Sequence, residues 1–265
     1  MKINLTQNKN FKLFKIISKV AQENNQTVYI VGGYVRDLLM QRKAPTDIDF
    51  VTEQSGIELA KAVGKELGDL KVSVFKTYGT AMIKYKDLDL EFVGARKESY
   101  SEDSRKPAVE TGTLEDDQKR RDFTVNALAI SLNAENFGEL IDPFNGREDM
   151  QNKILRTPLE PAQTYSDDPL RMMRAIRFAS VLHFEIEKNS LEAIKQEAER
   201  IKIVSMERIM VEFNKIMLSE KPSVGLKLME ETTLLEKIIP ELTALRGIEE
   251  VEGQTHKDNF WHTLE

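Results

Sequence analysis

The sequence has no cysteine, no long apolar run and no excess of basic residues, and each absence excludes a class of protein. Without cysteine the chain forms no disulfide and no thiolate metal site. No stretch approaches the roughly 20 consecutive apolar residues of a membrane-spanning helix. The apolar positions of 11–20 are interrupted by lysines, which rules out the core of a secretory signal. We therefore expect a cytoplasmic protein that does not associate with membranes.

Charge and length narrow the class further. The 265 residues carry 38 basic and 44 acidic side chains, a net charge of −6, whereas dedicated nucleic-acid binders are usually basic. This balance argues against broad non-specific binding of nucleic acid but allows a local basic face. The length allows one large domain or two to three small ones, each with a proper core.

The first half of the sequence alternates between strand and helix patterns. Helices are predicted over 11–24, 34–41 and 56–67, and strands over 28–31, 47–51, 71–75, 81–85 and 88–93. Residues 95–117 are polar and aperiodic, which predicts a mobile loop. After the turn signal of 142–146, nearly everything up to 239 has helical periodicity, with breaks near 158–165, 183–188 and 221–222. The predicted fold class is therefore α+β, with a mixed-sheet head followed by an all-helical region.

The head contains a pattern suited to binding phosphate. The segment 29–38 indicates a buried strand, a turn at Gly32 and Gly33, and a helix that carries Arg36 early. Glycine lets backbone N–H groups approach a ligand, and a helix start presents unpaired N–H donors. Alone, the pattern also describes an ordinary strand-to-helix turn, but the aspartates that follow favour a ligand site.

Two aspartates alternate on the next predicted strand. Side chains at i and i+2 point to one face, so Asp47 and Asp49 aim together from positions roughly 6–7 Å apart along the backbone. Paired carboxylates beside a triphosphate site are typical of Mg²⁺ binding for phosphoryl or nucleotidyl transfer. The alternative is a solvated strand edge, with Asp47 a turn residue after Pro45. Glu91, on the strand 88–93, is either a third carboxylate near the metals or part of a polar face.

A second charged motif covers 120–127. Its adjacent residues Arg120 and Arg121 suit contacts with a triphosphate or with RNA phosphates, and Asp122 suits a hydrogen bond to a ribose hydroxyl. The alternative is a charged helix end that leads into a buried segment.

A third motif begins the helical region. Asp168 before Pro169 is a good helix N-cap and needs no ligand for that role. Along the helix that follows, Arg171, Arg174 and Arg177 flank an apolar stripe with few acidic residues nearby in the sequence. This pattern indicates an anionic or nucleobase partner.

Together these motifs resemble the class II branch of the tRNA nucleotidyltransferase and poly(A) polymerase superfamily, most closely its bacterial CCA-adding members. The matching segments are Gly-Gly-x-x-Arg-Asp with Asp-x-Asp, Arg-Arg-Asp-Phe-Thr-x-Asn-Ala, the turn at 142–146, the helix start at 168–171 and Glu207-Arg208. Each motif is modest alone, but five in the family's order over nearly the whole chain make a strong match. The chain departs from the family at Asp167, where glutamate is common.

The resemblance implies a nucleotidyltransferase head over 1–143, a helical neck over 144–205 that recognises the nucleobase, and the start of a helical body over 206–265. Residues His256 to His262 are similar to the opening of a histidine–aspartate phosphohydrolase domain cut off at Glu265, so a longer native protein is expected. Two histidines in such a segment bind nothing by themselves. The segment 95–117 resembles the family's flexible loop, which helps to accommodate ATP.

The activity implied by the resemblance is template-independent addition of CCA, from CTP and ATP, to the 3′ end of tRNA with Mg²⁺ as cofactor. Asp47 and Asp49 would bind the metal and, with Glu91, act in catalysis. The nucleotide would be bound by Gly32, Gly33, Arg36, Arg121, Asp122, Asn126, Asp168, Arg171 and Arg174. A poly(A) polymerase or an A-adding tRNA enzyme would share these motifs. A catalytically silent nucleotide- or RNA-binding module is the alternative from another class.

Overall fold

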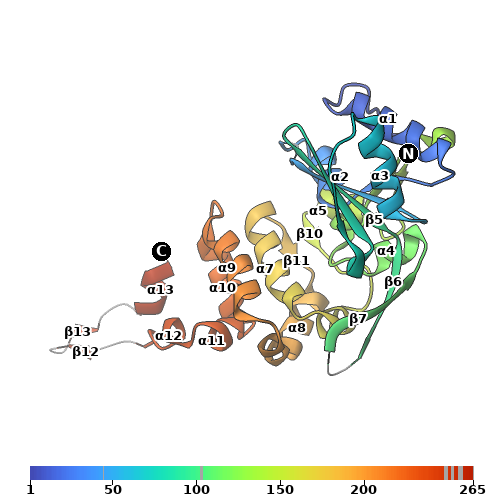
Figure 1. Cartoon of the computed structure of the whole chain (residues 1–265). Coiled ribbons are helices and arrows are strands. Elements are labelled where there is room, and N and C mark those ends of the chain that lie inside the picture. Colours follow the sequence, from blue (N-terminus) through green and yellow to red (C-terminus); the bar gives the residue numbers. More distant parts are fainter. Residues whose placement is uncertain (44, 102–103, 248–249, 252–253, 256–258, 265) are drawn as a thin grey trace. The chain divides into compact units, whose positions relative to one another are not determined.

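The computed structural model describes residues 1–43, 45–101, 104–247, 250–251, 254–255 and 259–264 (Figure 1). The chain divides into two compact units: Met1–Ser99 with Pro107–Met150, and Tyr100–Lys106 with Gln151–Glu265. In the part of the chain that is described, no helix is long and apolar enough to cross a bilayer. The division into head, neck and body stays a prediction.

The first unit is built on a mixed seven-stranded sheet, which confirms the predicted fold class. The sheet has the order β3-β4-β5-β2-β1-β8-β9. Its strands are β1 (Tyr29–Val31), β2 (Asp47–Thr52), β3 (Val72–Phe75), β4 (Thr80–Tyr85), β5 (Leu88–Gly94), β8 (Ala129–Ser131) and β9 (Leu140–Ile141). Strands β2 and β5 run parallel, whereas the other neighbours are antiparallel. The single parallel pair lies at the centre of the sheet.

Five helices belong mainly to this unit, with short 3-10 turns between elements. They are α1 (Phe11–Glu23), α2 (Gly33–Leu39), α3 (Gly56–Glu66), α4 (Leu114–Lys119) and α5 (Gly146–Asn152). The 3-10 turns are Lys76–Tyr78, Thr124–Asn126 and Ala134–Asn136. Helix α3 begins at the predicted place because the Ser55 hydroxyl accepts a hydrogen bond from the Glu58 N–H, as an N-cap does.

The two faces of the sheet differ in character because strand side chains alternate. Ile48 and Phe50 of β2 and Phe92 of β5 share one face, where they belong to the same hydrophobic core as the apolar residues of α1 and α3. Asp47, Asp49 and Glu91 stand at the alternate positions and therefore on the opposite face. The main core thus fixes the sheet from one side and leaves the carboxylates on the other.

The mobile loop predicted over 95–117 is wrong for most of its length. The segment forms β6 (Arg96–Ser101), β7 (Ser104–Thr111) and helix α4, and β6 pairs with β7 as a separate two-stranded sheet. The sequence did not indicate these strands, because their residues show no alternation of apolar and polar side chains. Glu102 and Asp103, part of the predicted loop, lie outside the described residues.

The second unit is mainly helical, as predicted. Its helices are α6 (Pro161–Asp167), α7 (Leu170–Leu182), α8 (Lys188–Glu197), α9 (Met206–Met217), α10 (Pro222–Glu231), α11 (Leu234–Ile238), α12 (Pro240–Thr243) and α13 (Asn259–Leu264), with a 3-10 turn at Ala198–Ile203. Short strands also occur: β10 (Ile154–Leu155) pairs with β11 (Glu185–Ile186), and β12 (Glu250–Val251) with β13 (Gln254–Thr255). Helix α6 begins inside the predicted break at 158–165 and continues beyond it, because Pro161 starts a helix rather than ending one.

Close helix packing in this unit depends on one glycine. Helix α7 packs against α9 and α10, and a Cβ at Gly225 of α10 would lie 2.3 Å from Cγ2 of Ile216 and 2.7 Å from Oγ of Ser180. Any larger residue would push the helices apart.

The segment predicted to open a histidine–aspartate domain is described only in part. His262 lies in α13, and His256 lies outside the described residues.

Candidate functional site

The turn between β1 and α2 has the conformation that the double glycine predicts. Gly32 has φ +74°, in the left-handed region, and the helix begins at Gly33. A Cβ on Gly32 would lie 2.8 Å from Nη1 of Arg121 and 3.6 Å from Oδ2 of Asp49. The Gly32 N–H donates to the carbonyl of Leu128 at 3.2 Å. This glycine therefore contributes space for Arg121 beside Asp49, rather than a free N–H donor.

The predicted carboxylates stand on neighbouring strands. In the parallel pairing of β2 with β5, Asp49 lies opposite Glu91, and Asp47 lies opposite Asp89. Asp89 forms an ion pair with Lys84 at 2.8 Å at the surface. Asp47 is exposed, whereas Asp49 and Glu91 are half-buried. The sheet thus brings Asp47 and Asp49 to one face, as the alternation predicted, and the pairing of β2 with β5 adds Glu91 to that face.

Burial and mutual repulsion raise the pKa of two of these carboxyls. For Asp49 the loss of solvent is the main cause; the Arg121 guanidinium opposes it, and the charges of Asp47 and Asp117 add to it. Burial also raises the pKa of Glu91, followed by the charge of Asp49. A positive charge placed among these groups would relieve both effects.

The aspartate pair suits a divalent cation that keeps substrate phosphates and water among its ligands, rather than one enclosed entirely by protein side chains. Among the described residues, no three histidine, cysteine, aspartate or glutamate side chains converge closely enough to hold a metal ion. Mg²⁺ is commonly bound by only one or two carboxylates, and substrate phosphates and water complete its shell. Asp47 and Asp49 lie on one strand face, and burial raises the pKa of Asp49, which matches that arrangement.

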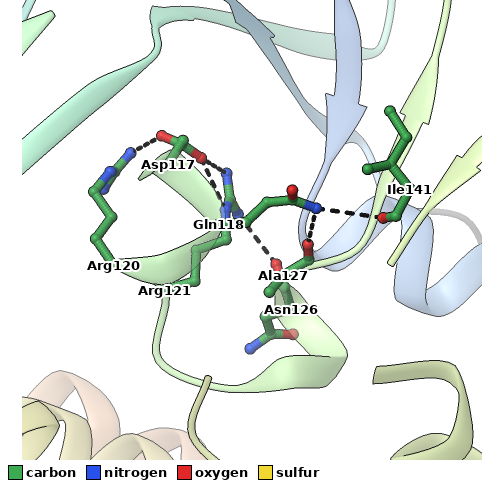
Figure 2. A network of polar contacts seen from close by, with 7 residues as sticks. All are labelled: Asp117, Gln118, Arg120, Arg121, Asn126, Ala127 and Ile141. Carbon is green, nitrogen blue, oxygen red and sulfur yellow. Dashed lines mark hydrogen bonds and ion pairs between the residues drawn. The ribbon is translucent and has the colours of Figure 1, made fainter. Parts of the chain in front are cut away.

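A buried carboxylate organises the arginine pair (Figure 2). Asp117 of α4 has no exposed surface; its Oδ2 accepts from Nε of Arg121 at 3.0 Å and from Nη2 at 2.9 Å, and its Oδ1 pairs with Arg120. Burial alone would raise the pKa of Asp117, but Arg121 and Arg120 outweigh it and hold the pKa below its usual value. Nη1 of Arg121 donates to the carbonyl oxygen of Asn126 at 3.2 Å.

Asn126 connects this network to Arg36. Its Oδ1 accepts from Nη1 of Arg36 at 2.7 Å, and its Nδ2 donates to Oδ1 of Asp122 at 3.0 Å. Arg36 is 8% exposed, and its Nε also donates to Asp37 at 2.9 Å. The structure thus brings together the predicted residues Gly32, Arg36, Asp49, Arg121, Asp122 and Asn126.

Sequence reasoning missed Asp117 and its neighbour Gln118. Nε2 of Gln118 donates to the carbonyls of Ala127 at 2.6 Å and Ile141 at 3.3 Å, which ties α4 to the sheet (Figure 2). A signal for Asp117 was present, because an aspartate three and four residues before two arginines is an ion-pair spacing on a helix. The assignment of 95–117 to a loop concealed it.

The Asp142 turn has a structural role at the start of α5. The Asp142 carboxylate accepts hydrogen bonds from the N–H groups of Gly146 at 2.7 Å and Arg147 at 2.9 Å. It therefore caps the start of α5. The Thr124 hydroxyl donates to Asp149 at 2.7 Å and holds the same helix against the arginine motif.

The predicted residues of the second unit lie at the start of α7. The Asp168 carboxylate accepts a hydrogen bond from the Leu170 N–H at 3.3 Å, and the Asp168 carbonyl accepts from the Arg171 N–H at 2.9 Å. The predicted N-cap at Asp168 is displaced, because α7 begins at Leu170 with Pro169 at its N-cap position and without a side-chain cap. The bond from Asp168 to the N–H two residues on is instead a local turn contact. Arg171 and Arg174 follow on α7 and are half-buried. Asp167 accepts from Nε2 of Gln163 at 2.6 Å.

Arg177, further along α7, does have an acidic partner. Its Nε lies 2.5 Å from Oε2 of Glu212, a buried residue of α9. The predicted scarcity of acidic partners is therefore wrong for Arg177, because the partner comes from a helix distant in sequence. Its guanidinium also stacks on the Phe178 ring at 3.9 Å. Glu207 and Arg208, the last matching motif, are exposed at the start of α9.

Comparison with known proteins gives the following matches. Residues 28–156 match the family model for the Poly A polymerase head domain, and residues 183–245 match that for the probable RNA and SrmB-binding site of polymerase A. An A-adding tRNA nucleotidyltransferase of Aquifex aeolicus is 36% identical over 249 residues, covering 89% of this chain and 28% of that protein. A CCA-adding enzyme of Bacillus velezensis is 37% identical over 241 residues, covering 90% of this chain and 57% of that protein.

A solved structure of a tRNA nucleotidyltransferase, complexed with a primer tRNA and an incoming ATP analogue, matches with a TM-score of 0.74. It is 34% identical, and the match covers 86% of this chain and 67% of that one. The chain thus spans little more than half the length of the curated CCA-adding relative, and less of the A-adding one.

Proposed function

The chain belongs to the class II tRNA nucleotidyltransferase and poly(A) polymerase family, and from that premise we propose that it adds nucleotides to the 3′ end of tRNA without a nucleic-acid template. We further propose that it uses both CTP and ATP and completes the CCA end. The observation that carries the proposal is the aspartate pair on β2, with Arg121 held against the Gly32 turn beside it. An anionic metal site next to a cationic phosphate site is what nucleotidyl transfer requires.

The head supplies the groups that act on the reacting phosphate. Transfer forms a bond between the 3′-oxygen of the RNA and the α-phosphorus of the nucleotide, as the bond to pyrophosphate breaks. Asp47 and Asp49 would hold a divalent ion such as Mg²⁺, which lowers the pKa of the 3′-hydroxyl and neutralises charge on the α-phosphate. Glu91 stands beside Asp49 as a third carboxylate. Arg121 would contact the triphosphate, and Asp122 the ribose.

In this proposal Arg36 does not contact phosphate from the protein surface. It is buried, and its guanidinium is engaged by Asp37 and Asn126. We therefore assign it to the wall of the triphosphate site, where it adds positive charge and fixes Asn126.

Asp168 and Arg171 would choose the base. Cytosine presents an amino donor beside a ring-nitrogen acceptor, and adenine presents the same pair, so a carboxylate acceptor next to a guanidinium donor suits both. Uracil and guanine present a carbonyl where the carboxylate lies and would be repelled. The hydrogen bond from the Leu170 N–H supports this role, because it holds the Asp168 carboxylate at the start of the helix that carries Arg171.

A-only addition is the second candidate, and one observation favours it: a curated relative at 36% identity is an A-adding tRNA nucleotidyltransferase. Polyadenylation is a third, because the head matches the Poly A polymerase head domain. The partners of the proposed enzyme are the tRNA 3′ end, CTP and ATP, and a cytoplasmic location follows from a tRNA substrate.

The test is incorporation of labelled CTP, and then ATP, into tRNA that ends at the discriminator base, and separately into tRNA that ends in CC. C followed by A supports CCA addition, whereas A on the CC end alone supports the A-adding alternative. A tails on any RNA end indicate a poly(A) polymerase. No incorporation of either nucleotide on any of these RNAs would overturn the proposal.

A matched pair of variants assigns the chemistry to the aspartates. Asp49→Asn should abolish incorporation. Asp89→Asn, on the same sheet face but paired with Lys84, should retain it.

A further inference from the structure

Asp117 is placed so that it orients the side chain of Arg121. It lies on α4 with no exposed surface, and one of its oxygens accepts two hydrogen bonds from the same guanidinium, that of Arg121. A carboxylate that meets Nε and Nη2 together fixes the plane of the guanidinium, whereas a single contact would let it rotate. The network is drawn in Figure 2.

The third nitrogen of Arg121 fixes the direction in which the group points. Nη1 donates to the Asn126 carbonyl and lies 2.8 Å from the place that a Cβ of Gly32 would take. A guanidinium has five N–H donors. These contacts use three, so one donor on each terminal nitrogen has no partner among the described residues.

We propose that Asp117 is a positioning residue for nucleotide binding: it holds Arg121 against the Gly32 turn so that the two remaining donors bind the triphosphate of the incoming nucleotide. The inference rests on the proposed function for the identity of the ligand. It goes beyond that function in assigning a role to a carboxylate that itself touches no substrate.

The alternative is that Asp117 only stabilises α4. The two possibilities differ in their effect on a ligand that consists of phosphates alone. If Asp117 acts through Arg121, its loss weakens the binding of inorganic tripolyphosphate, because this probe has neither base nor ribose. If its role is only structural, the folded fraction binds the probe as the wild type does.

The experiment measures tripolyphosphate affinity by calorimetry for the whole chain and for Asp117→Asn, Arg121→Gln and the double variant. Asp117→Asn should weaken binding by about tenfold to a hundredfold, the value of a charge-assisted contact. In the Arg121→Gln background the same change should have no further effect. Equal losses in both backgrounds, or unchanged affinity of Asp117→Asn, would overturn the proposal.

Asp116→Asn is the matched control. Asp116 is the adjacent carboxylate of α4, and it caps the helix by accepting from the Thr113 N–H at 2.9 Å. This variant should lose helix stability but keep its affinity for tripolyphosphate. A loss of affinity equal to that of Asp117→Asn would mean that α4 stability, rather than Arg121 orientation, sets binding.

Two arrangements keep the result decisive. If circular dichroism shows that Asp117→Asn is unfolded, Asp117→Glu replaces it, because this variant keeps the charge but displaces the guanidinium. Asp117→Glu should lose the same affinity for tripolyphosphate and should have no further effect in the Arg121→Gln background. Binding of tripolyphosphate requires no RNA and no transfer. A wild type that binds the probe but incorporates no nucleotide would therefore refute the proposed function and leave the role of Asp117 to its own test.

Discussion

Replacing Gly32 by alanine tests the central geometry of the head. The residue has φ +74° and ψ −138°, a conformation that few residues other than glycine adopt and that costs an L-residue at least about 1 kcal/mol. The new methyl would also lie 2.8 Å from Nη1 of Arg121, so the guanidinium has to move. Because Asp117 and the Asn126 carbonyl hold it, the movement breaks at least one charge-assisted hydrogen bond, worth about 1.5–3 kcal/mol. We expect a total loss of about 2–4 kcal/mol in the free energy of unfolding.

Gly79→Ala provides the matched comparison. Gly79 also has a positive φ, +62°, but its ψ of 24° puts it in the αL region, which L-residues reach at modest cost, and a Cβ there would meet nothing within 4 Å. It should therefore lose only the backbone contribution of about 1 kcal/mol and retain full affinity for nucleotide.

Denaturant unfolding and nucleotide binding, measured on both variants, separate strain from crowding. Gly32→Ala should lose nucleotide affinity by tenfold or more, whereas Gly79→Ala should not. If the two variants match in both stability and affinity, Arg121 moves without consequence and the geometry assigned to this site is refuted.

Three further results are expected. The raised pKa of Asp49, caused first by burial, means that its ionised form costs stability: the cost is absent below the ordinary value of 3.8 and grows as the pH rises through the folded value. In metal-free buffer Asp49→Asn should therefore melt above the wild type at neutral pH, with the two midpoints converging towards pH 3.8; a constant difference would contradict the assignment. Gly225→Ala should destabilise the helical unit by about 1–3 kcal/mol in denaturant, since its methyl would meet Ile216 and Ser180, and an unchanged midpoint would show that α10 shifts freely. Arg171→Ala should lower the ratio of CTP to UTP incorporation more than it changes total turnover, and an unaltered ratio would remove this residue from base choice.

The sequence predicted those parts of the fold that repeat a simple period. Strands β2, β4 and β5 have apolar residues at every second position, and the same period predicted that Asp47 and Asp49 share a face. The position of Glu91 on that face depends on the pairing of β2 with β5, which no local pattern indicates. Strands β6 and β7 were missed because their residues, such as those of Arg96–Ser101, show no such alternation. In the part of the chain that the structure describes, they form a two-stranded sheet with each other.

Contacts between segments that are distant in the sequence could not be predicted from local patterns. The pairing of Arg177 with Glu212 joins α7 to α9, and no local pattern announces it. The engagement of Arg36 by Asn126 is of the same kind. The contacts of Asp117 with Arg120 and Arg121 are different, since they occur within one helix end and follow a spacing that can be read directly.

The parallel pairing of β2 with β5 has a consequence for the order in which the head matures. Hairpin β4–β5 closes locally, whereas β2 and β5 are separated in the sequence by α3 and the β3–β4 hairpin, so that their pairing closes a longer segment of chain. Contacts between distant segments form late, because the intervening chain must be ordered first. Asp49 and Glu91 therefore face each other only in a nearly complete sheet. A nascent or partly unfolded head therefore presents no such carboxylate pair.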